Sequence, residues 1–282
     1  MATTKFTQAE KAKQLHQLHH SGKLLILPNI WDVLGAKLLE DLGYEAIATA
    51  SAAVAYSNGY NDGENIPFGE VLHILKRIAG NINVPVTADI ESGFAANEKE
   101  LEKNMHELIE TGVVGINIED TDKQTKTLLP AEVQCRKIKL IKKISLEKDV
   151  PLFINARTDT YVHESDFASP QEQLEETIKR GIAYKDAGAD CFYPILLHNE
   201  QHIKAIIEVL QMPVNILMMP GVPELSALQQ MGVARVSLGP GFFKYAVKAM
   251  QELAIKLQNN EGTKDVTNNT VTSEYLKRLV RD

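Results

Sequence analysis

The sequence predicts an α/β fold, a (β/α)8 TIM barrel with an N-terminal helix and a C-terminal helical extension. Eight short apolar segments alternate with eight segments of helical pattern. Four of these helices end in a glycine-containing turn just before the next strand, at Gly43, Gly112, Gly188 and Gly232, where a glycine is expected. The strands are continuously apolar, which is typical of parallel strands covered by helices. The alternative is an open doubly wound sheet, but no glycine-rich phosphate-binding motif follows the first strand.

The elements can be assigned in order along the chain. Residues 1–22 have the pattern of an amphipathic helix. The strands are predicted at 24–27, 46–50, 84–88, 115–118, 152–155, 189–193, 214–217 and 234–238. The helices are predicted at 32–42, 67–80, 98–111, 130–145, 170–187, 200–210, 222–231 and 242–258, three of them beginning at a proline, a residue favoured in the first helical turn. Residues 259–269 form a polar linker and 273–280 a short helix, so we predict a barrel domain at 1–258 and an arm at 259–282.

Composition excludes several classes of protein. The apolar fraction is 44% and the charged fraction 24%, as in ordinary soluble domains. The net charge of −7 and the absence of a long basic run argue against a nucleic-acid partner. No apolar run reaches membrane-span length and no signal core begins the chain, so we expect no membrane partner and a cytoplasmic location.

The cysteines and the clustered histidines are not expected to carry chemistry. Cys135 and Cys191 have neither metal-ligand spacing nor a disulfide framework. His16, His19 and His20 could suggest a metal site. They lie on a polar helix, however, and we do not expect them to be ligands.

The polar residues that follow the third strand are the first candidate site. Asp89 and Glu91 alternate where a buried strand becomes a loop, and alternate positions of a regular strand point the same way. Carboxylate oxygens suit a hard cation such as Mg²⁺. The alternative is that both residues only solvate the loop and cap the next helix.

Polar side chains also follow the other strands, and active residues of such barrels sit at the C-terminal strand ends. The set consists of Asn29, Trp31, Asp32, Ser51, Asp62, Asp89, Glu91, Glu119, Asp120, Asn155, Arg157, Asp159, Asn215 and Ser237. The charged members concentrate on strands two to five, which are neighbours in a barrel. Such close acids require a cation or an arginine between them. A divalent metal fits, and Arg157 could hold an anionic substrate bidentately.

Five motifs, in this order, resemble the isocitrate lyase/phosphoenolpyruvate mutase superfamily over nearly the whole chain. They are PNIWD at 28–32, ATASAA at 48–53, DIESGF at 89–94, GINIED at 115–120 and NARTD at 155–159. The resemblance implies a (β/α)8 barrel, Mg²⁺ or Mn²⁺, and a substrate that passes through an enolpyruvate-like anion. It also implies a homo-oligomer, a dimer or a tetramer, in which the last barrel helix is swapped between subunits.

The resemblance also implies roles for particular residues. The metal ligands fall on Asp89, Glu91 and Glu119, with Asp in most characterised members where Glu91 stands here. Catalytic positions fall on Asp62, Glu119, Lys123 and Arg157, and substrate-binding positions on Trp31, Ser51, Ala52, Ala53, Arg157 and Asn215. The amides of Ala52 and Ala53 would form the oxyanion site, where they and the metal stabilise charge on an enolate oxygen.

The loop after the fourth strand departs from the patterns of the family. Residues 121–129 contain no cysteine and no histidine, whereas lyases of the family carry a Lys-Lys-Cys-Gly-His-type motif there. Mutases and phosphonopyruvate hydrolases carry Asp-Lys-x-x-Pro-Lys directly after the strand, but Asp122 and Lys123 are shifted and no proline follows until Pro130. Lys123 or Lys126 could still close over an anion. Strand six also lacks the acid that many family lyases use, so cleavage of isocitrate or methylisocitrate is not expected.

We predict an Mg²⁺-dependent lyase or phosphonomutase-like enzyme acting on a small carboxylate or phosphonate of the 2-oxo acid or enolpyruvate type. It would break or rearrange a C–C or P–C bond through a metal-stabilised enolate. The alternative is a catalytically degenerate barrel that binds a small carboxylate and a metal. A Schiff-base aldolase is disfavoured because no lysine lies at a strand end.

Overall fold

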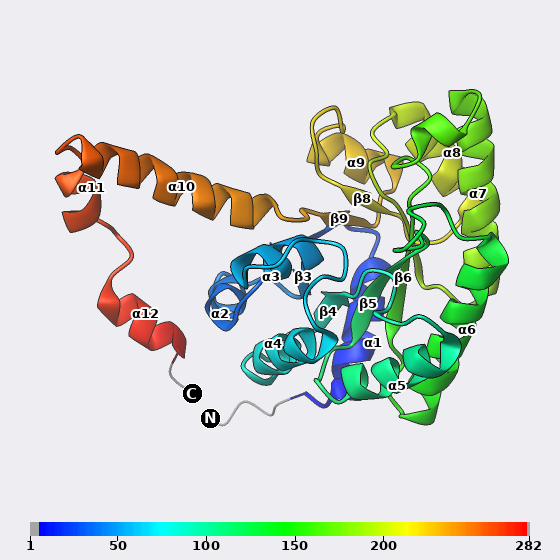
Figure 1. Cartoon of the computed structure of the whole chain (residues 1–282), viewed down its shortest axis with the longest axis horizontal. Coiled ribbons are helices and arrows are strands. Elements are labelled where there is room, and N and C mark those ends of the chain that lie inside the picture. Colours follow the sequence, from blue (N-terminus) through cyan, green and yellow to red (C-terminus); the bar gives the residue numbers. More distant parts are fainter. Residues whose placement is uncertain (1–5, 281–282) are drawn as a thin grey trace.

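A computed structural model of the chain describes residues 6–280 and shows parallel strands surrounded by helices (Figure 1). The first strand is divided at Pro28 into β1 (Leu25–Leu27) and β2 (Asn29–Ile30), because proline has no N–H to donate to a neighbouring strand. The others are β3 (Ile47–Thr49), β4 (Val86–Asp89), β5 (Gly115–Glu119), β6 (Phe153–Thr158), β7 (Cys191–Pro194), β8 (Asn215–Leu217) and β9 (Arg235–Ser237).

The strands close into a barrel. Six of them pair in the order β2-β3-β4-β5-β6-β7, and three in the order β1-β9-β8. All of these pairings are parallel. The two groups meet twice, because β1 and β2 belong to one stretch of chain and a parallel bridge joins Phe192 to Val214. The predicted (β/α)8 barrel is confirmed, and an open sheet is excluded.

The outer helices follow the strands as predicted. They are α2 (Val33–Asp41), α4 (Phe68–Gly80), α5 (Glu98–Ile109), α6 (Ala131–Glu147), α7 (Pro170–Asp186), α8 (Glu200–Leu210), α9 (Leu225–Met231) and α10 (Gly241–Gln258). Several begin at side-chain caps, for example Asn97 before α5 and Ser169 before α7, since these side chains accept from the free N–H groups of the first turn.

Three short helices were not predicted. The first is α3 (Ser51–Ser57), within a segment expected to be a loop. The second is α11 (Thr263–Thr267), inside the expected linker, and the third is the 3-10 turn η1 (Glu164–Asp166). The expected N-terminal helix appears as α1 (Gln8–His19). The part of that prediction at 1–5 lies outside the described residues.

Helix α1 covers the N-terminal end of the barrel. Its Leu15 is fully buried with Leu27 and Phe153 in a small cluster, separate from the main core between strands and outer helices. Gly115 makes this close approach possible, because a Cβ there would lie 2.7 Å from Leu15 Cδ2. The opposite, C-terminal end of the barrel is left open for a site.

The C-terminal part of the chain leaves the barrel. Helix α10 extends away from it (Figure 1), and none of its residues is buried. Helix α12 (Ser273–Val280) returns to α2, where both guanidinium Nη atoms of Arg278 lie 2.8 Å from the Asp41 carboxylate and Leu279 is buried. The division between a barrel domain at 1–258 and an arm stays a prediction. Within residues 6–280, no helix is long and apolar enough to cross a membrane.

Candidate active site

The predicted charged residues meet at the C-terminal ends of β4, β5 and β6. Glu119 is the last residue of β5 and pairs in register with Arg157 on β6. Its carboxylate lies between two cations. Oε2 is 2.6 Å from Arg157 Nη1, and Oε1 forms an ion pair with Lys123 Nζ. Lys123 Nζ also lies 2.8 Å from Glu91 Oε2, so one lysine joins two of the three predicted metal ligands.

Burial sets the electrostatics of this group. It raises the pKa of Glu119 to about 7, Arg157 and Lys123 oppose the rise, and the charge of Asp159 adds to it. Burial alone would lower the pKa of Lys123, but the charges of Glu119 and Glu91 raise it above its usual value. Lys123 is therefore a permanent cation that points into the site from the loop after β5.

Asp89 and Asp62 form a second group, without such a cation. Ser51 Oγ donates to Asp89 Oδ2 at 2.9 Å. Asp62 is exposed, yet partial desolvation of its carboxyl raises its pKa, and the nearby charge of Asp89 raises it further, whereas the charges of Lys123 and Arg157 lower it. Among residues 6–280, no lysine or arginine forms an ion pair with either carboxylate. The negative charge of the site is therefore least compensated at this corner.

Arg157 is held by acids on two sides. Its Nε lies 2.6 Å from Asp159 Oδ1, and Thr121 Oγ1 donates to the other oxygen of Asp159 at 2.5 Å. Its Nη2 has no hydrogen-bond partner among the described residues. Arg157 therefore has fixed geometry and one nitrogen free for an anion.

The donor set fits a hard cation at the corner formed by Asp62 and Asp89. Five carboxylates (Asp62, Asp89, Glu91, Glu119 and Asp159) face two cations, Lys123 and Arg157. The surplus is negative, and oxygen donors suit Mg²⁺. No group of three His, Cys, Asp or Glu within 6–280 is arranged to ligate a metal directly. A cation here would therefore take water for its remaining ligands, as Mg²⁺ commonly does.

The amides predicted to bind an oxyanion belong to the first turn of α3. That helix begins at Ser51, and the first N–H groups of a helix have no acceptor within it. The amides of Ala52 and Ala53 are thus placed beside Ser51, which contacts Asp89. Their role stays a prediction.

Two predicted substrate-binding residues share no hydrogen bond or ion pair with the carboxylates within residues 6–280. Asn215 is fully buried, and its Nδ2 donates to Ser237 Oγ at 3.0 Å. Trp31 packs edge-on against Phe243 at a centroid distance of 5.1 Å and lines a cavity between α2 and α4. The structure does not bring either residue to the carboxylates, and their binding roles stay predictions.

Asp120, the neighbour of Glu119, faces the opposite way. Its carboxylate is buried against α7, where Arg180 Nη1 lies at 2.9 Å and Tyr184 OH donates at 2.6 Å. Successive residues of a strand point to opposite sides, so Glu119 reaches the site and Asp120 anchors an outer helix.

Glu64 is a residue of the site that sequence analysis missed. One oxygen of its carboxylate, Oε1, accepts from Ser92 N at 2.8 Å, Ser92 Oγ at 2.6 Å and Phe94 N at 3.1 Å. Its own N–H donates to Glu91 Oε1 at 2.9 Å. The only sequence signal was its place in a turn-rich loop two residues after Asp62.

The loop at 121–129 folds into a compact hairpin beside the site. Thr121 and Leu128 form an antiparallel bridge, and the Asp122 carboxylate accepts from the amides of Gln124 and Thr125 at 2.8 Å each. This turn directs Lys123 inward. Beside it lies a cavity of about 510 Å³, lined in part by Glu64, Ser92 and Lys123, within the size range of small-molecule sites.

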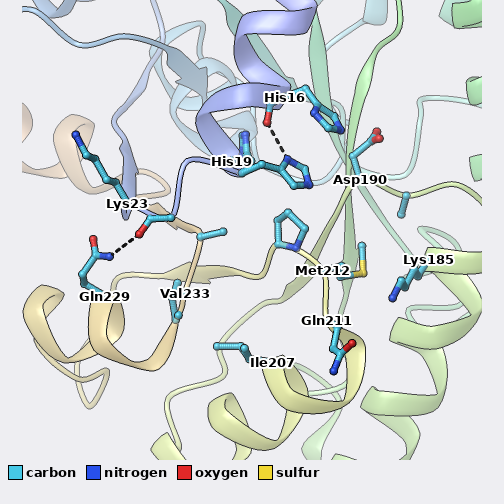
Figure 2. Close-up of a pocket in the computed structure, with 16 residues that line it drawn as sticks. His16, His19, Lys23, Lys185, Asp190, Ile207, Gln211, Met212, Gln229 and Val233 are labelled. Carbon is cyan, nitrogen blue, oxygen red and sulfur yellow. Dashed lines mark hydrogen bonds between the residues drawn. The ribbon is translucent and has the colours of Figure 1, made fainter.

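A second cavity, of about 560 Å³, opens at the N-terminal end of the barrel. Figure 2 shows His16 and His19 beside it, with Asp190 and Lys185 on one side and Lys23 on the other. His19 Nδ1 lies 2.8 Å from Leu15 O, and burial lowers the pKa of this ring to about 3. The rings of His16 and His20 stack on each other at 4.2 Å. His19 is buried, whereas His16 and His20 are exposed, and within 6–280 the three form no metal-ligand group.

Fold and site together define a (β/α)8 barrel with an acid-rich centre, of the type that acts on small anions. The family model for phosphoenolpyruvate phosphomutase matches residues 15–258. The chain belongs to this family, within the isocitrate lyase/phosphoenolpyruvate mutase superfamily.

Individual relatives agree with this assignment. The chain is 33% identical over 224 residues to an uncharacterized protein of Mycobacterium tuberculosis, covering 79% of this chain and 81% of that protein. It is 28% identical over 214 residues to 2-methylisocitrate lyase of Bacillus subtilis, covering 73% and 67%.

Solved structures extend the likeness to three dimensions. A Burkholderia cenocepacia structure described as a lyase/mutase has a TM-score of 0.86 at 30% identity, covering 96% of this chain and 95% of that one. Phosphonopyruvate hydrolase in complex with oxalate and Mg²⁺ has a TM-score of 0.83 at 22% identity, covering 97% and 95%. At that identity the likeness concerns the fold alone.

Proposed function

We propose that this chain is an Mg²⁺-dependent enzyme acting on a small 2-oxo acid or enolpyruvate-type anion. It cleaves or rearranges a C–C or P–C bond, as a lyase or a phosphonomutase-like enzyme. The observation that carries the proposal is the pair Asp62 and Asp89, for which no ion pair forms within residues 6–280, beside a fixed Arg157 at one barrel mouth. The match to the phosphoenolpyruvate phosphomutase family and the likeness to 2-methylisocitrate lyase support it.

Each residue has a separate task in this proposal. Asp89 and Asp62 hold the cation. Glu91 and Glu119 face it and are both paired with Lys123. Bound Mg²⁺ supplies Lewis-acid stabilisation of charge on an oxygen of the substrate. Arg157 holds the carboxylate or phosphonate of the substrate through Nη2, while Ser51 fixes Asp89 and the α3 amides receive the oxyanion.

The hairpin at 121–129 narrows the choice of reaction. It carries Lys123 but no cysteine or histidine that could act as a loop acid. We therefore do not propose cleavage of isocitrate or 2-methylisocitrate. A reaction in which Lys123 stabilises an anion fits the hairpin better, because Lys123 remains cationic.

A substrate panel tests the proposal. Oxaloacetate, phosphonopyruvate and alkylated malates are assayed with Mg²⁺ and again with excess chelator. We expect turnover of at least one compound at an enzyme-like rate, on the order of 1 s⁻¹ or more, and its loss in chelator.

The second candidate function, a barrel that binds without catalysing, is motivated by the divergent hairpin. Thermal stabilisation by oxalate with Mg²⁺, without turnover of any compound, would support the non-catalytic binding function and contradict the proposed enzyme.

We also propose that the chain is a homo-oligomer in which α10 is exchanged between subunits. In the single chain this helix exposes Tyr245 at 76% and Met250 at 64%, and such apolar exposure indicates an interaction surface. Light scattering is expected to give the mass of a dimer or tetramer for the parent protein. For the double variant Y245E/M250E it is expected to give the mass of a smaller species. A monomeric parent protein contradicts the proposal. The matched variant Lys248→Glu, in which a 70% exposed side chain on the same helix changes charge, should keep the parent's mass.

A further inference from the structure

Two loops of the site are joined by reciprocal hydrogen bonds centred on Glu64. The loop between α3 and α4 carries Asp62 and Glu64, and the loop after β4 carries Glu91, Ser92 and Phe94. The carboxylate of Glu64 accepts three hydrogen bonds from the second loop, and the amide of Glu64 returns one to Glu91. A charged acceptor makes such bonds stronger than neutral ones.

The backbone at this junction is held in an uncommon conformation. Glu64, Glu91 and Phe94 have φ angles of 61°, 49° and 52°, in the left-handed region that residues other than glycine seldom adopt. Such conformations persist where surrounding contacts over-determine them. Lys137 adds one contact, since its Nζ donates to Ser92 O at 3.1 Å. Asn104 Nδ2 also holds the second loop, donating to Gly93 O at 3.1 Å and to Phe94 O at 2.7 Å. The hydrogen bonds of Glu64 differ from these because they join the two loops to each other.

We infer that Glu64 is a positioning residue that fixes the distance between Asp62 and Asp89. The inference rests on the proposed function, because the two aspartates form its cation corner. Asp62 lies two residues before Glu64, and Asp89 lies three before Ser92. Like charges at these two aspartates repel, so a tie between their loops keeps the corner closed before a cation binds. Glu64 acts through the loops, and touches neither aspartate.

Two substitutions of Glu64 distinguish the effect of its hydrogen-bond acceptor from the effect of its negative charge. Glu64→Gln keeps an acceptor oxygen for the amides of Ser92 and Phe94, whereas Glu64→Ala removes it. Glu70→Ala is the matched control, since Glu70 is an exposed residue of α4 whose carboxylate accepts only from Tyr60 OH, at 2.8 Å. We expect all three variants to share the oligomeric state and fold of the parent, and circular dichroism and light scattering check this.

Hydrogen exchange and Mn²⁺ binding are the measurements. In Glu64→Ala we expect the amides of Ser92 and Phe94 to exchange at least about tenfold faster, and the Mn²⁺ dissociation constant from electron paramagnetic resonance to rise about tenfold or more, as the loss of a charged hydrogen-bond acceptor implies. Glu64→Gln should stay within about threefold of the parent in both, and Glu70→Ala should match the parent. With a substrate in hand, the metal concentration at half-maximal rate should rise more than kcat falls.

The outcomes distinguish this inference from the function on which it rests. Unchanged amide exchange in Glu64→Ala would show that Glu64 does not hold the two loops together. A Glu64→Gln variant as impaired as Glu64→Ala would also overturn the inference, because it would mean that only the charge of Glu64 matters. A parent protein that binds no Mn²⁺ overturns the proposed cation corner instead, while the exchange experiment still decides whether Glu64 joins the loops.

Discussion

Replacing Asp89 with asparagine is expected to lower Mg²⁺-dependent kcat/KM by roughly a thousandfold, because the variant loses the charged ligand of the cation. Metal ions contribute several kcal/mol of transition-state stabilisation, and each ~1.4 kcal/mol is a factor of ten in rate. The side chain keeps its shape, and Ser51 Oγ can still donate to the amide oxygen. Steady-state kinetics on the substrate found in the panel measure the effect.

The same change should leave the fold intact. The charge of Asp89 raises the pKa of Asp62, which shows that the two carboxylates disfavour each other's ionised form. Removing one charge relieves that repulsion but also weakens the attraction of Asp89 for Arg157 and for buried Arg235, so the thermal midpoint of Asp89→Asn should stay close to that of the parent. Destabilisation of this variant would mean that its activity loss reports unfolding, and turnover within tenfold of the parent would remove Asp89 from the cation site.

Asp166→Asn is the control for loss of one negative charge at this end of the barrel. Asp166 lies in η1 after β6, and its side chain is 53% exposed. It contacts His163 but none of the five carboxylates. We expect parental kinetics and metal dependence from it. A similar loss of activity in both variants would indicate that Asp89 acts through the overall electrostatic potential at the C-terminal end of the barrel and not as a metal ligand.

The barrel could be read from the sequence because its signals are local. Continuous apolar strands and glycines after helices depend only on neighbouring residues. The apolar strands recur in every repeat, and the glycines in half of them. Helix α3 was missed because Ser51–Ser57 directly follows a strand and precedes a turn-rich loop. Its alanines favour helix, but seven residues give a weak periodic signal.

The site was only partly predictable, since its contacts join residues distant in sequence. Motif positions placed Asp62, Asp89, Glu119 and Arg157 at one mouth. The bond from Glu64 to Ser92 spans 28 residues, and no local pattern announces it. Nor does the sequence show that Lys123 fills the space between Glu91 and Glu119, because that depends on the turn of the hairpin. Because Lys123 pairs with both glutamates, Asp62 and Asp89 are the carboxylates that remain for a cation, and this follows from the structure alone.

Asp120→Asn should have the largest effect on stability. Oδ2 of this fully buried carboxylate accepts from Thr158 Oγ1 at 2.8 Å, from Arg180 Nη1 at 2.9 Å and from Tyr184 OH at 2.6 Å, while Oδ1 accepts from Asp159 N at 2.8 Å. Asparagine has only one acceptor atom for these four donors and leaves buried Arg180 without this counter-charge. Removing one partner of a buried pair costs about 3–5 kcal/mol, and urea unfolding measures the loss.

Two further variants identify the cause of that loss. Asp265→Asn breaks an exposed pair with Lys256, in which both side chains are about half exposed, and should leave the urea midpoint unchanged. Adding Arg180→Met to Asp120→Asn should recover part of the stability, because it removes a buried charge whose remaining carboxylate partner is the partly exposed Glu176. A loss below about 1 kcal/mol in Asp120→Asn, or no recovery in the double variant, would show that the pair does not anchor α7.

Glu119 and Asp120 are adjacent acids at one strand end, yet their neighbours assign them opposite tasks. We therefore expect Asp120→Asn, assayed well below its unfolding midpoint, to lose less than about tenfold in kcat/KM, equivalent to ~1.4 kcal/mol. Asp120 is linked to Arg157 indirectly, through Thr158 Oγ1 and the amide of Asp159, which limits the effect on substrate binding. A thousandfold loss, equal to that of Asp89→Asn, would instead place Asp120 in the chemistry.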